Sequence, residues 1–198
     1  MSTLFPDAPV LPAGLAHVAD FLGESEEATL LESLRALPVV EARYRGYLAK
    51  RRTVSFGHGY DFSSNRLHDA PPWPEFLKPL RKRAAAWAGI DCESFVHCLV
   101  TQYRPGTPIG WHRDVPQFEH VVGISLGSAC RLRFRPYPPT KDWTRHTFTL
   151  ALEPRSAYRM SGDIRWQWQH SIPDVRAERW SITFRTLSRK GASERAQQ

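Results

Sequence analysis

The pattern of hydrophobic and polar positions changes character near residue 93. Before that point, the segment SEEATLLESLRAL starts at Ser25 with a capping residue, has two acidic residues in its first turn, and carries leucines at helical spacing. The segment PPWPEFLKPLRKRAAAWAGI (71–90) predicts a second helix that ends at Gly89. Pro79 inside this segment indicates that the helix starts late or is kinked.

Beyond residue 93 the hydrophobic stretches are short, often alternate with polar residues, and are separated by turn residues. They read SFVHCLVTQY, HVVGISL, CRLRFRPY, HTFTLAL, WQHSI and RWSITFRTL. Many short strands at this spacing predict an antiparallel sandwich or barrel, with the early helices supporting one face.

The length of 198 residues and the hydrophobic content of 41% suffice for one domain with a substantial core. We expect an extended, proline-rich arm over residues 1–14, a single domain over 15–187, and a mobile tail over 188–198, which lacks apolar periodicity. The chain shows no signal-peptide pattern and no stretch of membrane-spanning length. Three cysteines without CxxC spacing indicate neither a disulfide framework nor a zinc ribbon. A cytoplasmic protein is the default expectation.

The charge balance is basic. Lys and Arg number 27 against 20 Asp and Glu, which gives a formal net charge of +7. A basic domain suits a polyanionic partner, of which nucleic acid is the commonest. The alternative is that this charge only keeps the protein in solution.

A candidate metal site begins in GWHRD, residues 110–114. Side chains two positions apart on a strand point to the same face, so His112 and Asp114 can converge on one ion. His170, on a later predicted strand, is the candidate for a third ligand. Two imidazoles and one carboxylate are the ligand set of non-haem Fe(II) oxygenases. The alternative is a solvated pair on a strand edge.

Two arginines stand at the ends of RWSITFR (179–185). The apolar residues of this segment occupy one strand face, which we expect in the core, while Arg179 and Arg185 flank small hydroxylated residues on the other face. The strand spans roughly 20 Å, so two arginines leaning together leave a gap about one small dicarboxylate wide. Arginine suits bidentate carboxylate binding. A solvated strand face is the alternative.

Together, H-x-D, a distant His and R-x5-R resemble the AlkB family of Fe(II)- and 2-oxoglutarate-dependent dioxygenases. The resemblance extends from about Arg51 to Leu187. It implies a mainly β fold with flanking helices: a double-stranded β-helix (jelly-roll) core over about 93–187, N-terminal helices, and a substrate-recognition lid over about 45–70.

The resemblance also implies roles for individual residues. His112, Asp114 and His170 would hold Fe(II), Arg179 would bind the distal carboxylate of 2-oxoglutarate, and Arg185 would bind the carboxylate nearest the metal. Tyr103 matches a family tyrosine that touches the cosubstrate. Thr101 stands where the family usually has asparagine.

In this family, Fe(II), 2-oxoglutarate and O2 hydroxylate an alkyl group on a nucleobase nitrogen, and the product loses an aldehyde to restore the base. Tyr60 and Phe62 of the lid would stack on a flipped base, or would only pack the lid onto the core. Arg51 and Arg52 would contact phosphates. Pro116 stands where some members carry an acid that reads the base edge.

Two further segments admit two interpretations each. The arginines of CRLRFRPY share one strand face and form either a phosphate track or a solvated face; they are Arg131, Arg133 and Arg135. The residues before His170 either close the pocket or pack it; they are Arg165, Trp166 and Trp168.

The expected function is therefore oxidative dealkylation of N-alkylated bases in DNA or RNA by a monomeric enzyme. A dioxygenase of the same fold that acts on tRNA modifications or on a protein side chain would share the same motif. A jelly roll that binds nucleic acid without catalysis is less consistent with a complete set of ligands and arginines.

Overall fold

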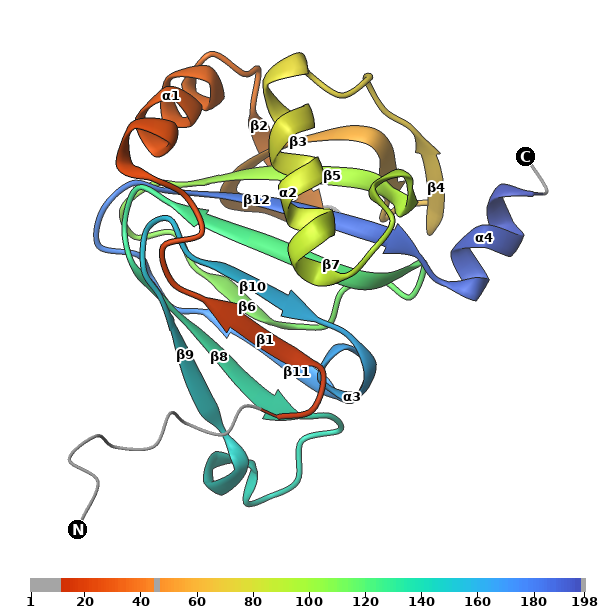
Figure 1. The fold of residues 1–198 in the computed structure, drawn as a ribbon. Coiled ribbons are helices and arrows are strands. Elements are labelled where there is room, and N and C mark those ends of the chain that lie inside the picture. Colours follow the sequence, from red (N-terminus) through yellow and green to blue (C-terminus); the bar gives the residue numbers. More distant parts are fainter. Residues whose placement is uncertain (1–11, 45–46, 197–198) are drawn as a thin grey trace, which may run out of the picture.

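A computed structural model describes residues 12–44 and 47–196 of the chain. Its strands pair antiparallel in two sheets that form the jelly roll implied by the resemblance (Figure 1). The major sheet has the strand order β1-β10-β7-β12-β5-β3-β2, with β4 pairing β3, and the minor sheet has the order β6-β11-β8-β9. No helix within the described ranges is long and apolar enough to cross a membrane.

The elements follow the predicted change from helices to strands. The strands are β1 (Leu15–Val18), β2 (Val40–Tyr44), β3 (Tyr47–Asp61), β4 (Arg66–Asp69), β5 (Phe95–Tyr103), β6 (Ile109–His112), β7 (Phe118–Leu126), β8 (Cys130–Pro136), β9 (Phe148–Leu152), β10 (Ala157–Met160), β11 (Trp168–Ile172) and β12 (Arg179–Leu187). The helices are α1 (Glu24–Arg35), α2 (Lys78–Ala88), α3 (Gly162–Trp166) and α4 (Arg189–Arg195), with short 3-10 turns η1 (Glu75–Leu77), η2 (Cys92–Ser94) and η3 (Trp143–His146).

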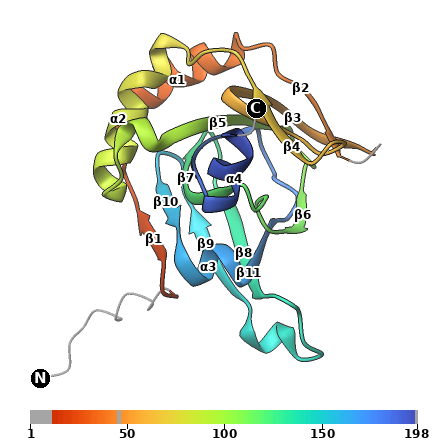
Figure 2. The ribbon, with the colours of Figure 1, turned by 90° about the vertical axis from the view of Figure 1, so that its right-hand side faces the viewer.

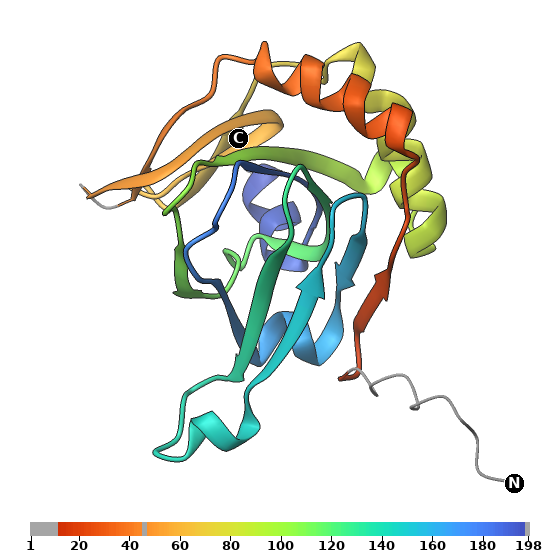
Figure 3. The same ribbon diagram turned by 90° about the vertical axis from the view of Figure 1, so that its left-hand side faces the viewer.

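The core has two layers. Helices α1 and α2 cover the outer face of the major sheet (Figure 3), and the apolar face of β12 packs there through Trp180, Ile182 and Phe184. A second cluster between the two sheets includes Leu132 and Phe134 of β8. The predicted division of β12 into two faces is therefore confirmed on its apolar side.

The helix boundaries differ slightly from the sequence expectation. Helix α1 begins at Glu24 with Gly23 as its N-cap, so Ser25 lies inside the first turn. Pro79 lies in the first turn of α2, where its missing N–H is tolerated, which accounts for the late start. The helix ends at Gly89 in the left-handed region (φ 66°).

The expected lid is largely an extension of the major sheet. Residues 52–57 of β3 pair with β5, while the following residues of β3 pair with β4 as a hairpin. Gly57, with φ 77°, lies where the strand passes from one partner to the other. The lid is thus anchored along one strand, and residues 45–46 lie outside the described residues.

The tail expected to be mobile forms α4 instead (Figure 2). Ser188 caps the helix by accepting a hydrogen bond from Gly191 N–H. A Cβ on Gly191 would lie 2.2 Å from the carbonyl oxygen of Gln117, so the helix backbone rests directly on the chain before β7. Because these contacts are made by backbone and polar groups, apolar periodicity does not reveal them. Most of the expected N-terminal arm, residues 1–11, lies outside the described residues.

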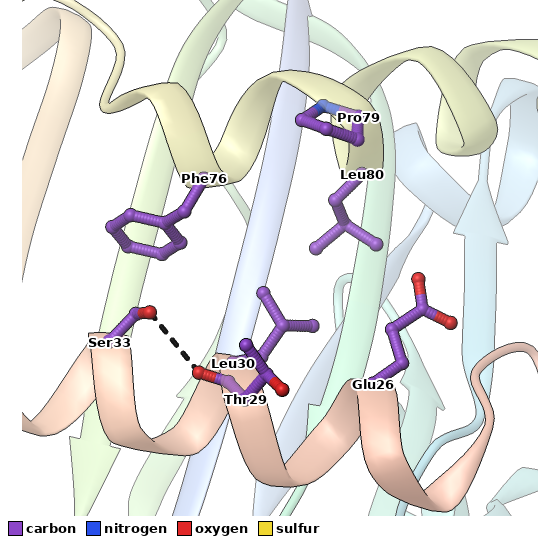
Figure 4. A pocket seen from close by; sticks show the side chains of 7 residues that line it. All are labelled: Glu26, Thr29, Leu30, Ser33, Phe76, Pro79 and Leu80. Carbon is purple, nitrogen blue, oxygen red and sulfur yellow. Dashed lines mark hydrogen bonds between the residues drawn. The ribbon is translucent and has the colours of Figure 1, made fainter.

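An apolar groove of about 350 Å³ lies between α1 and the η1–α2 segment (Figure 4). Leu30, Phe76 and Leu80 line it, together with polar side chains along α1 and with Pro79 of α2. It lies on the helical side of the major sheet, away from the candidate ligands, and therefore plays no part in the site described next.

Candidate active site

Two histidines meet across the edge of the minor sheet. His112 at the end of β6 and His170 on β11 are register partners, and their ring centroids are 4.2 Å apart. Nδ1 of His112 lies 2.9 Å from the carbonyl oxygen of Gly110, so Nδ1 carries the proton. The lone pair of Nε2 is then available to a metal, which is the tautomer that such a bond fixes in metal-binding histidines.

Asp114 lies in the loop that follows β6, not on the strand itself. The expectation that His112 and Asp114 share a strand face is therefore wrong, because β6 ends at His112. The carboxylate still reaches the histidines, with Oδ2 3.8 Å from Nε2 of His170. Its Oδ1 accepts hydrogen bonds from Nη2 and Nε of Arg185 at 2.7 and 3.1 Å. Oδ2 is buried and has no hydrogen-bond partner.

The protonation states of these side chains suit a metal. Burial opposes ionisation of Asp114, but the Arg185 guanidinium and His170 hold the pKa of this carboxyl well below its usual range. Burial lowers the pKa of His170 to about 3, and burial also lowers the pKa of His112. A metal requires a carboxylate and neutral imidazoles, and these groups are already in that form.

As the side chains stand, no group of three His, Cys, Asp or Glu residues in the described part of the chain is arranged to hold a metal ion. The donor set nevertheless fits Fe(II). Two neutral imidazoles and a carboxylate with one buried, unpartnered oxygen are the chemistry that this ion prefers.

The buried Arg179 guanidinium has only part of its hydrogen-bonding capacity satisfied. Its side chain is 1% exposed, and its Nε and Nη1 have no hydrogen-bond partner. Its Cζ lies 5.0 Å from the centroid of the Tyr103 ring. Buried N–H groups of this kind are nearly always satisfied, so this arginine fits an anionic ligand. Arg185 is also buried, which excludes a solvated face for this strand.

The register of β5 and β12 sets the other cosubstrate candidates beside these arginines. Tyr103 is the partner of Arg179, and Thr101 is the partner of Ser181. Both Tyr103 and Thr101 are buried. The structure thus brings the residues named from the R-x5-R resemblance onto one polar face between the sheets.

His97 belongs to the same face and was missed from the sequence. It is the register partner of Arg185, its Nδ1 accepts from Nη1 of Arg185 at 3.3 Å, and its ring stacks on Phe118 at 4.7 Å between centroids. Strand alternation counted backward from Thr101 would have placed His97 on this face.

Tyr158 on β10 is a second missed residue. Its ring covers Gly123, where a Cβ would lie 2.3 Å from two ring carbons. Burial and the nearby Asp114 carboxylate raise the pKa of its hydroxyl, and the Arg179 guanidinium partly opposes this rise. No motif in the sequence marks this tyrosine, because only the pairing of β10 with β7 brings it to the site.

The two lid arginines lie on opposite faces of β3. Arg52 donates from Nη1 to Oε1 of Gln102 at 3.1 Å, on the face turned away from the candidate ligands. Arg51 points the other way and lies close enough to His112 to lower its pKa. Only Arg51 of this pair faces the site.

The two lid aromatics contact each other. The rings of Tyr60 and Phe62 pack edge to face, 5.0 Å between centroids, and the Tyr60 hydroxyl lies 3.3 Å from Oδ1 of Asn65. They form one aromatic unit at the hairpin end of β3.

The aspartate loop, residues 113–117, is held from two sides. Nη2 of the buried Arg165 donates to the carbonyl oxygens of Val115 and Phe118 at 2.7 and 2.6 Å. From the other side, Ser188 Oγ donates to the carbonyl oxygen of Pro116 at 2.6 Å. Arg165 therefore acts as a positioning residue for Asp114.

The other residues near this loop have structural partners. Gln117, the residue after Pro116, is buried and donates from Nε2 to Glu194 of α4. The ring of Trp168 packs on Phe148 at 5.4 Å, and the Arg165 guanidinium carbon lies 4.4 Å from the centroid of the Trp166 ring. These contacts support the packing interpretation for both tryptophans.

A two-sheet jelly roll whose interior brings two histidines, an aspartate and two buried arginines together defines a class of iron oxygenases. The chain matches the 2OG-Fe(II) oxygenase superfamily over residues 14–186 and belongs to that superfamily. Membership generally implies Fe(II), 2-oxoglutarate and O2 as cofactor and cosubstrates.

The relatives narrow this class toward AlkB-like proteins. The chain is 28% identical to the alkylated DNA repair protein ALKBH8 homolog of Arabidopsis thaliana, covering 81% of this chain and 51% of that protein. It is 25% identical to the probable RNA/DNA demethylase ALKBH6 of Danio rerio, covering 91% of this chain and 78% of that protein. The solved structure of OsALKBH1 shares the fold, with a TM-score of 0.66 at 17% identity over 89% of this chain and 98% of that one.

These similarities confirm the resemblance to the AlkB family. The chain spans about half of the Arabidopsis relative. It spans 24% of the tRNA (carboxymethyluridine(34)-5-O)-methyltransferase ALKBH8 of Mus musculus, to which it is 29% identical over 82% of its own length.

Proposed function

We propose that this protein removes alkyl groups from nucleobase nitrogens in DNA or RNA by oxidation, coupled to decarboxylation of 2-oxoglutarate to succinate and CO2. One observation carries the proposal. Arg179 is buried with Nε and Nη1 lacking hydrogen-bond partners, and it lies on the same interior face as Arg185, which contacts the buried carboxylate of Asp114. An anionic cosubstrate beside a metal explains why both charges are kept in the interior.

His112, Asp114 and His170 would hold Fe(II). When bound, the metal with 2-oxoglutarate and O2 supplies hydroxylation of an unactivated C–H bond. The protein fixes the ligand orientation. Gly110 sets the His112 tautomer, and Arg165 together with Ser188 restrains the aspartate loop.

Arg179 would bind the distal carboxylate of 2-oxoglutarate, and Arg185 the carboxylate nearest the metal. Nε and Nη2 of Arg185 both donate to Oδ1 of Asp114, so Arg185 can bridge the metal ligand and the cosubstrate. Tyr103 borders Arg179 and can donate its hydroxyl proton to the cosubstrate. Thr101 can donate one hydrogen bond at most, where an amide would offer more.

The base would enter between the lid hairpin and the edge of the minor sheet. Arg51 faces this side and can meet a phosphate, and the Tyr60–Phe62 unit offers an aromatic surface for a flipped base. Arg52 does not take part in this proposed contact, because it donates a hydrogen bond to Gln102 on the opposite face.

Hydroxylation of a modified tRNA base is the second candidate. Its support is the set of relatives that carry a tRNA (carboxymethyluridine(34)-5-O)-methyltransferase name, although this chain spans only about a quarter of them. The same metal and cosubstrate residues would serve both reactions.

The test is to incubate the enzyme with Fe(II), 2-oxoglutarate and O2 and either N-methylated oligonucleotides or tRNA. Loss of about 14 Da from a base, which is one CH2 group, together with an equal amount of succinate supports dealkylation. A gain of about 16 Da on a tRNA base, which is one oxygen atom, supports the second candidate. His170→Ala serves as the inactive control. Succinate formation that neither nucleic acid stimulates would contradict both candidates.

A further inference from the structure

The outward face of the minor sheet combines arginines with a tryptophan. Arg131, Arg133 and Arg135 alternate along β8 with Leu132 and Phe134, which point into the core. Trp111 alternates in the same way with the inward His112 on β6. The four strands of this sheet contain no Asp or Glu. We call Trp111, Arg131, Arg133 and Arg135 the arginine face.

Two of these arginines are held in place. Nε of Arg133 donates to Ser171 Oγ at 3.1 Å, and Nε of Arg135 donates to Gln169 Oε1 at 2.8 Å. Both guanidinium carbons lie near the Trp111 ring, 5.1 and 4.5 Å from its centroid. These contacts reduce the side-chain entropy lost when the arginines bind a ligand.

The three arginines of β8 form a row along which a polynucleotide backbone can bind. Successive arginines on one face of β8 are about 6.7 Å apart, so the three span roughly 13 Å. The line continues to Tyr137, which is 42% exposed and lies under the Arg113 guanidinium at 3.8 Å. Alternating arginine and aromatic groups are typical of surfaces that bind single-stranded nucleic acid.

The arginine face also begins at the candidate active site. Trp111 precedes His112 in the chain, and β6 is the edge strand of the minor sheet. A strand whose target base reaches the metal ligands could therefore continue over Trp111 toward β8 without leaving the protein surface.

The geometry points to a second contact region for the substrate: the arginine face binds the phosphodiester backbone of nucleotides that flank the target base in a single-stranded polynucleotide. This inference rests on the proposed function, since it assumes a nucleic-acid substrate. The phosphodiester backbone is common to RNA and DNA, so both are tested.

The experiment measures binding of labelled 12-nucleotide RNA and DNA single strands to the full chain by fluorescence anisotropy at several salt concentrations. We compare R133Q/R135Q with the matched charge control K78Q/K82Q on α2, whose lysines are exposed. Each lost phosphate contact lowers the log–log salt slope by about 0.7 for single strands. R133Q/R135Q should lower it by about 1.4 and weaken affinity at low salt at least tenfold, while K78Q/K82Q keeps the wild-type slope.

Two further measurements are needed. The first separates an effect on folding from an effect on binding, and the second separates the role of the arginine face from the proposed catalytic activity. Arg131→Gln changes an exposed residue and should lower the slope by about 0.7 with an unchanged melting temperature. Turnover of a methylated mononucleoside, which has no flanking phosphates, should be the same in R133Q/R135Q and the wild type.

If the wild type binds and R133Q/R135Q matches K78Q/K82Q, the arginine face is not a contact region, and the proposed function stands. If the wild type binds neither RNA nor DNA, both the inference and the proposed nucleic-acid substrate are wrong.

Discussion

Replacing Arg179 by methionine should remove 2-oxoglutarate binding without destabilising the ligand-free protein. The guanidinium is buried with Nε and Nη1 unpartnered. Each unsatisfied buried polar group destabilises a fold by about 1–3 kcal/mol. Methionine retains much of the volume and removes these groups, so the free energy of unfolding of Arg179→Met should be at least equal to that of the wild type.

The loss of cosubstrate affinity should be large. Hydrogen bonds to charged groups contribute about 1.5–3 kcal/mol each, so a lost bidentate carboxylate contact amounts to about 3–6 kcal/mol. That corresponds to a dissociation constant for 2-oxoglutarate higher by about two to four orders of magnitude.

Titration calorimetry with 2-oxoglutarate and urea unfolding without it measure the two quantities. Arg176→Met is the matched control, because Arg176 is exposed and lies three positions earlier in the chain. A variant that loses several kcal/mol of stability but binds 2-oxoglutarate within threefold of the wild type would show that Arg179 is a structural arginine.

Three more predictions follow from the packing around the site. Arg165→Met should free the aspartate loop and raise the Fe(II) concentration needed for half-maximal succinate formation by about 10–100-fold; an unchanged iron requirement would refute its positioning role. Gly123→Ala should destabilise the fold by about 1–3 kcal/mol in urea unfolding because the new Cβ meets the Tyr158 ring, and the double variant G123A/Y158L should recover most of that loss, whereas additive effects would argue against this contact. Gly191→Ala should displace α4 from Gln117 and speed proteolysis of the tail, while Ser193→Ala, on an exposed position of the same helix, should not; equal cleavage rates would contradict the docking.

The sequence was informative where side-chain direction follows from local spacing. Alternation on one strand suffices to predict that Arg179 and Arg185 share a face, and the turn residues around the short strands suffice to predict an antiparallel sandwich or barrel. The strand rule failed at Asp114, because β6 ends two residues before it. Nothing in the motif indicates where a strand ends.

The residues missed from the sequence depend on pairing between distant strands. His97 reaches Arg185 through the register of β5 with β12, and Tyr158 reaches the site through β10 and β7. Arg52 could have been separated from Arg51 by alternation, but its bond to Gln102 required the register of β3 with β5. Helix α4 was not predicted, because its Ser188 cap and the contact of Gly191 with the Gln117 backbone leave no hydrophobic pattern in the sequence.

The docking of α4 fixes where this domain can be joined to another protein. A junction placed directly after β12 would remove Ser188 and Glu194, which bond Pro116 and Gln117 in the aspartate loop. The jelly roll would keep its sheets, but one of the two restraints on Asp114 would be lost. A fusion partner attached on the C-terminal side therefore has to begin beyond residue 196, and one attached directly after β12 would yield a folded domain in which Asp114 is less firmly held.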